Sequence, residues 1–139
     1  ALTALAGPVS NLIMAFLFFL LANGVLVLFA SFDFIHYIVF FFGFVAKINI
    51  TLAVFNLIPI PPLDGSRIIA ALLPDRTYYK LMQYERYLYF ALLALLFLDV
   101  LDLPLSLLSN GVISFMKWIF DFIFPQNIVD YVYYIISVF

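Results

Sequence analysis

Residues 9–32 read VSNLIMAFLFFLLANGVLVLFASF and contain no charged side chain. A helix needs about 20 predominantly apolar residues to cross the hydrocarbon core of a bilayer. This stretch therefore predicts a membrane-spanning helix, and it decides the fold class of the chain. Gly7 and Pro8 stand just before it and are typical of a helix start, because the first turn of a helix does not use the N–H that proline lacks.

The composition extends this prediction to the whole chain. Of the 139 residues, 68% are hydrophobic and 10% are charged, whereas a soluble domain is about half apolar and a quarter charged. The net charge of −2 gives no electrostatic reason to expect nucleic acid. The absence of cysteine excludes disulfides and cysteine-bound metals. We expect the lipid bilayer as the surroundings and no nucleic acid as a partner.

Further apolar segments follow the first. Residues 37–58 and 105–124 are long enough to cross a membrane, residues 86–101 are short for a span, and residues 126–139 should lie at the interface or pack on the bundle. Hydrocarbon requires backbones that satisfy their own hydrogen bonds, and these segments are too long and too uniformly apolar for barrel strands. The prediction is an all-α, polytopic transmembrane helix bundle with about four membrane segments, forming a single domain, 1–139.

The basic residues predict the orientation of the bundle. Four of the six lie between the second and third segments: Arg67, Arg76, Lys80 and Arg86. The positive-inside rule places such a loop in the cytoplasm. We therefore expect an integral, multi-pass membrane protein whose loop 65–86 is cytoplasmic.

The second segment ends in FNLIPIPPLDGSRII, residues 55–69, where three prolines exclude a continuous helix. The backbone should become extended there and leave polar groups to satisfy. Irregular backbone persists within a membrane only where it is buried in protein or lines water. Asp64 follows the prolines, and an intramembrane carboxylate is by default a candidate functional group. The position of this break predicts a polar site near the cytoplasmic leaflet.

Asp64 also has two purely structural explanations. As the N-cap of a helix formed by GSRIIAALL, it would accept backbone N–H bonds and be favoured by the helix dipole. Alternatively, PLDG is a turn through which the chain leaves the membrane. The residue types alone leave all three explanations open.

The break nevertheless resembles a known motif. NLIPIPPLDG is similar to the N-x-x-P-x-P-x-x-D-G motif of the site-2 protease family of intramembrane zinc metalloproteases, with matches at Asn56, Pro59, Pro61, Asp64 and Gly65. Upstream, ALAGPVSN resembles the A-G-P-x-x-N stretch of the same family, with matches at Gly7, Pro8 and Asn11. The resemblance covers residues 1–98 and leaves residues 99–139 as an unassigned helical extension.

The resemblance implies specific roles. Asp64 would be the third protein ligand of one catalytic zinc ion, and Asn56 would contact the substrate carbonyl or the developing oxyanion. A capping or interhelical hydrogen bond is the structural alternative for Asn56. Pro59, Ile60 and Pro61 would pair with a transmembrane peptide substrate that has unwound into a strand. The implied activity is that of a metalloendopeptidase that cuts membrane-embedded helices.

The family also uses H-E-x-x-H, which supplies two histidine ligands and a general base. This chain has no such motif, and its single histidine, His36, lacks a following acid and is predicted on the opposite side from Asp64. We therefore expect His36 not to bind the metal and the two histidines to come from an upstream segment. Because the chain starts at Ala1 rather than Met, we expect it to be the C-terminal part of a larger protease and inactive alone. A pseudo-protease is the alternative.

Two other classes of function compete with the protease. A transporter fragment would also use broken helices, but it predicts a second, symmetry-related break, and no other proline lies inside a segment. A non-catalytic membrane protein that binds helices is the third possibility. The Gly-x-Gly-Asp context of aspartyl intramembrane proteases is absent. Nothing in the sequence sets an oligomeric state.

One pair of charges is predicted to be structural. Lys117 and Asp121 are four residues apart in an otherwise apolar segment, so they share one helix face. We expect them to pair and so reduce the cost of placing charge in the membrane.

Overall fold

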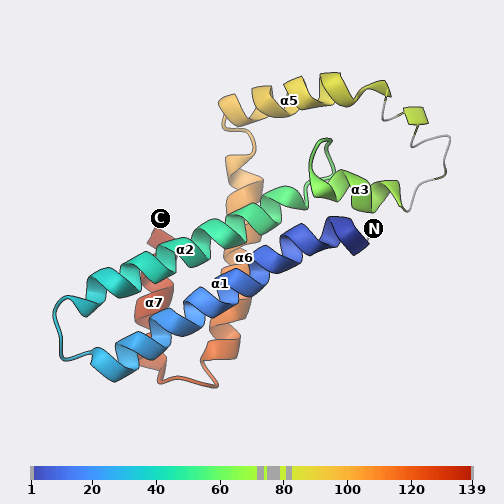
Figure 1. The fold of residues 1–139 in the computed structure, drawn as a ribbon. Helices are drawn as coiled ribbons and strands as arrows, with labels where there is room; N and C mark the ends of the chain where they lie inside the picture. Colours follow the sequence, from blue (N-terminus) through green and yellow to red (C-terminus); the bar gives the residue numbers. More distant parts are fainter. Residues whose placement is uncertain (1, 72–73, 75–78, 81–82, 139) are drawn as a thin grey trace.

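The structure is a computed structural model that describes residues 2–71, 74, 79–80 and 83–138. In these ranges the chain forms helices and no strand (Figure 1), which confirms the all-α prediction. The helices are α1 (Leu2–Phe29), α2 (Ile35–Asn56), α3 (Asp64–Ala70), α5 (Glu85–Phe97), α6 (Asp102–Phe120) and α7 (Gln126–Val138).

Three of these helices, α1, α2 and α6, are long and apolar enough to cross a membrane. Together with the composition they identify an integral membrane protein. The short third segment of the prediction becomes α5, which has only 13 residues and is therefore about 20 Å long. Figure 1 shows α5 lying across the end of the bundle where α6 begins. By length, it falls short of the hydrocarbon core.

Helices α1 and α2 form an antiparallel hairpin, and α6 and α7 cross behind it in the view of Figure 1. Small residues are fully buried along both: Ala15 and Ala22 on α1, Ala46 and Ala53 on α2. Without a hydrophobic force between helices in lipid, close backbone approach over small side chains is what holds membrane helices together. The large apolar side chains on the outer faces remain exposed, as a lipid surface requires.

Helices α6 and α7 pack on the hairpin through aromatic and branched side chains. The Phe120 ring of α6 lies 4.9 Å from the ring of Phe16 and 4.8 Å from that of Phe19, measured between centroids. On α2, a Cβ added at Gly43 would lie 3.2 Å from Ile136 and 3.3 Å from Ile135, so α7 packs directly over this glycine. The prediction that residues 126–139 pack on the bundle is confirmed for α7.

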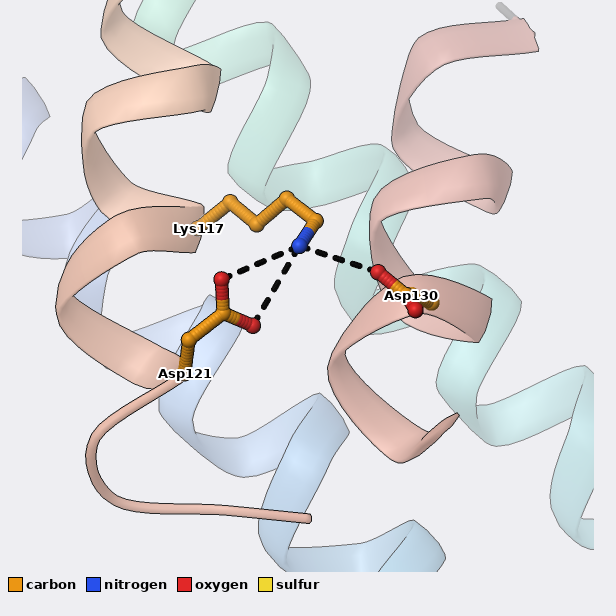
Figure 2. A network of polar contacts seen from close by, with 3 residues as sticks. All are labelled: Lys117, Asp121 and Asp130. Atoms are coloured by element: carbon orange, nitrogen blue, oxygen red, sulfur yellow. Dashed lines mark hydrogen bonds and ion pairs between the residues drawn. The ribbon is translucent and has the colours of Figure 1, made fainter. Parts of the chain in front are cut away.

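The predicted pair of Lys117 and Asp121 is present, with 3.0 Å between the ammonium nitrogen and a carboxylate oxygen. Figure 2 shows that Lys117 also reaches Asp130 on α7, at 2.9 Å. One cation therefore joins two carboxylates and ties α6 to α7. The sequence predicted the contact within α6 but not the one between helices.

The predicted helix start at Gly7 and Pro8 is wrong. Helix α1 runs through both, and Pro8 is buried inside it. Leu, Thr and Ala at positions 2–6 are compatible with a helix, and the fixed φ of proline suits helical backbone. The cost is one missing hydrogen bond to the carbonyl of Ala4, which the packing of the buried ring offsets.

Candidate functional site

The site begins where α2 ends, at Asn56. Pro59, Pro61 and Pro62 follow within six residues. Each removes a helical donor and disfavours helical backbone in the residue before it. The helix therefore stops for a local reason, and α3 restarts at Asp64 once the prolines have passed.

The segment between α2 and α3 is turned rather than extended, contrary to the prediction. The N–H of Ile60 donates to the carbonyl of Ile58 at 2.9 Å, and the N–H of Leu63 donates to the carbonyl of Ile60 at 3.0 Å. Proline fixes φ near −65°, which suits tight turns as well as strands. Ile60 therefore has both of its backbone groups engaged, and a substrate strand could pair with it only if these turns opened.

Gly65 fixes the return of the chain beneath the end of α2. A Cβ added at this residue would overlap the carbonyl oxygens of Leu57 and Ile58. Ser66 secures the same turn, because its N–H and its hydroxyl both donate to the carbonyl of Leu63, at 3.1 and 2.7 Å. The first turn of α3 is thus locked against the C-terminus of α2.

This arrangement aims the Asp64 carboxylate at α1. A Cβ added at Gly7 would lie 2.7 Å from Asp64 Oδ2, so the carboxylate occupies the space that any larger residue would need. The two sequence motifs, far apart in the chain, meet at this contact. Asp64 is half-buried, and no hydrogen bond or ion pair engages its carboxylate within the part of the chain that the structure describes.

The two asparagines of the motifs lie nearby in the fold. Asn56 is the last residue of α2 and is half-buried. Asn11 is half-buried on α1, four residues after Gly7, and therefore on the same helix face one turn along. Neither side-chain amide has a hydrogen-bond partner among the described residues, so the interhelical bond considered for Asn56 is not formed there.

The other predicted residues differ in exposure. Pro61 is buried and forms a cis peptide bond with Pro62, while Pro59 is exposed and Ile60 is half-buried. Pro59 borders an apolar cavity of about 270 Å³, which Leu108 and Val112 of α6 line from the other side. The segment therefore presents an apolar surface next to the polar residues.

The N-cap explanation of Asp64 is not what the structure shows. Leu63 holds the N-cap position, and Asp64 is the first residue of α3. The helix dipole still favours its negative charge there. Arg67 is exposed and forms no ion pair with Asp64 in the described ranges.

The described residues bring few side chains that could bind a metal to this site. In the ranges that the structure describes, no three His, Cys, Asp or Glu side chains come together. His36 lies at the other end of α2 from Asn56, about 30 Å along the helix axis, and its Nδ1 lies 3.0 Å from the Tyr131 hydroxyl. A half-buried carboxylate without a protein partner fits one oxygen ligand of zinc.

Sequence reasoning missed the reason for Gly7 and the role of Ser66. A glycine inside a helix costs about 1 kcal/mol relative to alanine, so its presence indicates close packing. That signal was available in the sequence, but only the fold identifies the packed group as Asp64. Ser66 gave a weaker signal, because serine is common in any first turn.

Comparisons with known proteins give concordant matches. The sequence model of Peptidase family M50 matches residues 23–98. The chain is 43% identical over 99 residues to "Putative zinc metalloprotease YwhC" of Bacillus subtilis, covering 68% of this chain and 44% of the relative. It is 42% identical over 66 residues to "Putative zinc metalloprotease MJ0611" of Methanocaldococcus jannaschii, covering 48% and 31%. No solved structure matches significantly. The chain thus spans less than half the length of either relative.

Proposed function

The chain belongs to peptidase family M50, and from this premise we propose that it is part of an intramembrane zinc metalloendopeptidase of the site-2 protease type. Asp64 supplies one zinc ligand, and transmembrane peptides are the substrates. The observation that carries the proposal is the contact between Asp64 and Gly7. It brings both sequence motifs to one half-buried carboxylate that no protein group engages among the described residues.

Zinc would take the Asp64 carboxylate as one ligand and two histidines from an H-E-x-x-H helix elsewhere in the complete protease. When bound, zinc polarises a carbonyl and lowers the pKa of its water. The locked turn at Gly65 and the close approach of Gly7 hold the carboxylate in one position. Such preorganisation matters, because supporting groups around a metal ligand change affinity or activity by about 10–100-fold.

The substrate would lie across the end of α2. The Asn56 amide has no hydrogen-bond partner in the part of the chain that the structure describes, so it can donate to a substrate carbonyl or to a developing oxyanion. The apolar cavity beside Pro59 suits a hydrophobic side chain of a membrane peptide. Pro59, Ile60 and Pro61 would then contact the substrate mainly through side chains, since turns engage the backbone of Ile60.

The site would lie near the cytoplasmic leaflet. Helices α3 and α5 lie at the end of the bundle where α2 ends (Figure 1). They carry Arg67 and Arg86, both exposed, and Arg76 lies outside the described residues. Basic residues concentrate in cytoplasmic loops. This orientation makes the polar break accessible from the cytoplasm.

The test is zinc content and peptide cleavage by the full-length protease, wild type against Asp64→Asn. We expect the variant to lose zinc and to cleave at least about 100-fold more slowly, because a metal ligand is removed. Asp99→Asn is the matched control. Asp99 is exposed with φ of 54°, a conformation that asparagine tolerates. Equal zinc and equal cleavage in wild type and Asp64→Asn would remove Asp64 from the site.

A further inference from the structure

A polar cavity, separate from the apolar cavity beside Pro59, lies between α2, α6 and the end of α7. It has a volume of about 420 Å³. Its polar lining residues come from three helices: Lys47 and Thr51, then Asp102, Ser106, Ser109 and Asn110, and finally Ser137. Asp102, Ser106, Asn110 and Ser137 are exposed, whereas Lys47 and Thr51 are half-buried and Ser109 is buried. An ionisable residue inside a membrane span is costly and is by default a candidate binding group, which here applies to Lys47 on α2.

The two charges of this cavity do not neutralise each other. Lys47 is half-buried on α2, and Asp102 is exposed at the start of α6. No ion pair joins either of them to another residue in the described ranges. An unpaired lysine within a span is one of the more expensive groups in a membrane protein. A ligand that carries both charges would satisfy both residues.

The charges also differ in exposure. Asp102, the first residue of α6, is exposed, whereas Lys47 on α2 is half-buried. The four-carbon stem of lysine lets its ammonium reach along the cavity wall. Asp102 therefore marks the open side, or mouth, of the cavity, and Lys47 belongs to its more enclosed wall.

Hydrogen-bonding groups follow the same division. The Ser106 hydroxyl near the mouth donates to the carbonyl of Leu103 at 2.9 Å, so it offers a ligand only acceptors. Deeper in the wall, Ser109 is 3% exposed and its hydroxyl has no partner among the described residues. The mouth thus suits a hydrogen-bond donor that is positively charged, and the interior has a cation and a spare hydroxyl for an anion.

We propose that this cavity binds the headgroup of a phosphoethanolamine lipid, with the phosphate near Lys47 and the primary ammonium near Asp102. The acyl chains would lie on exposed apolar residues that directly follow lining residues in the sequence, which are Ile48, Leu52, Leu103 and Leu107. A phosphocholine headgroup fits less well, because its quaternary ammonium has no N–H to donate. A purely anionic headgroup leaves Asp102 without a partner. The site is separate from Asp64 and does not depend on peptidase activity.

The experiment measures lipid binding to the full-length protein by native mass spectrometry. Phosphatidylethanolamine, phosphatidylcholine and phosphatidylglycerol with identical acyl chains are compared. We expect phosphatidylethanolamine to bind about tenfold more tightly than the other two lipids. It makes one more charge-assisted hydrogen bond than they do, and such a bond accounts for about a tenfold difference in affinity. Lys47→Met should weaken this binding about tenfold, and Lys47→Arg should retain it. Asp102→Asn should remove the preference for ethanolamine over choline.

Lys80→Met is the matched control, because Lys80 is exposed and does not line the cavity. It should bind all three lipids as the wild type does. Soluble phosphoethanolamine tests the role of the acyl chains and should bind far more weakly than the lipid. Equal binding of the three lipids, unchanged binding in Lys47→Met, equally tight binding of soluble phosphoethanolamine, or a peptide crosslinked in the cavity in place of lipid would each overturn the proposal.

Discussion

At the scale of single residues, two glycines of this site do different work. A Cβ at Gly65 would meet backbone carbonyls, whereas a Cβ at Gly7 would meet the end of the Asp64 side chain. Backbone cannot yield without moving two helices, but a carboxylate can turn away. Substituting Gly65 should therefore lower the stability of the fold. Substituting Gly7 should instead change the position of the Asp64 carboxylate and so the activity of the proposed peptidase.

Gly7→Ala should impair the peptidase while leaving the fold intact. The added methyl group pushes the Asp64 carboxylate from its position, and misplacement of a reacting group by about 1 Å can cost about 100-fold in rate. Zinc content and kcat/KM of the full-length protease are the measurements. Gly24→Ala on the same helix is the control, because its added Cβ meets no described atom within 4 Å beyond its chain neighbours and its own helix backbone. If Gly7→Ala and Gly24→Ala have equal activity, Gly7 does not position Asp64.

Gly65→Ala should destabilise the protein by about 1–3 kcal/mol, the usual cost of overpacking. The overlap with the carbonyls of Leu57 and Ile58 forces α3 away from α2. Thermal unfolding in detergent measures this effect. Gly111→Ala, which also meets open space, should change the apparent Tm little. An unchanged Tm in Gly65→Ala would contradict the packing described here.

At the scale of the helices, α6 and α7 share a buried apolar core, and Lys117 adds a polar contact between them. Lys117 pairs with Asp121 and Asp130, and its side chain is 25% exposed (Figure 2). Asp121 follows the last residue of α6, and the Asp130 side chain is 62% exposed. Without Lys117 the two carboxylates repel each other, and Asp121, which is 25% exposed, loses its partner. Partial exposure reduces this penalty.

Lys117→Met should lower the stability of the bundle by about 1–3 kcal/mol. Adding Asp121→Asn to that variant should recover part of the loss, because one of the orphaned charges is removed. A double-mutant cycle on thermal stability checks this prediction. Simple additivity of the two substitutions would show that the ion pair contributes nothing.

At the scale of the whole molecule, the orientation in the membrane remains a prediction from the positive-inside rule. The absence of cysteine in this chain permits a test by labelling single cysteines in a full-length protein that has no others. Gln83→Cys should react with an impermeant maleimide only after the cells are permeabilised. Ser31→Cys, in the turn between α1 and α2, should react in intact cells. The reverse pattern would place the Asp64 end of the bundle outside.

The sequence by itself determined the features that act over a few residues. Uninterrupted hydropathy predicted the spanning helices α1, α2 and α6. Three prolines ended α2, although turns rather than extended backbone follow. The i, i+4 spacing predicted the pair of Lys117 and Asp121. Each of these follows from backbone chemistry or helix geometry without any knowledge of neighbouring helices.

Only the tertiary structure decided which distant residues meet. Packing of α3 against α1 places Asp64 on Gly7, docking of α7 brings Asp130 to Lys117, and the same docking pairs His36 with Tyr131. Pro8 likewise became an interior helix residue because packing offset its lost hydrogen bond. Hydropathy does not decide which apolar helices pack together in lipid, because lipid tails are as apolar as the helices. Close packing and a few polar contacts therefore select the arrangement of the helices.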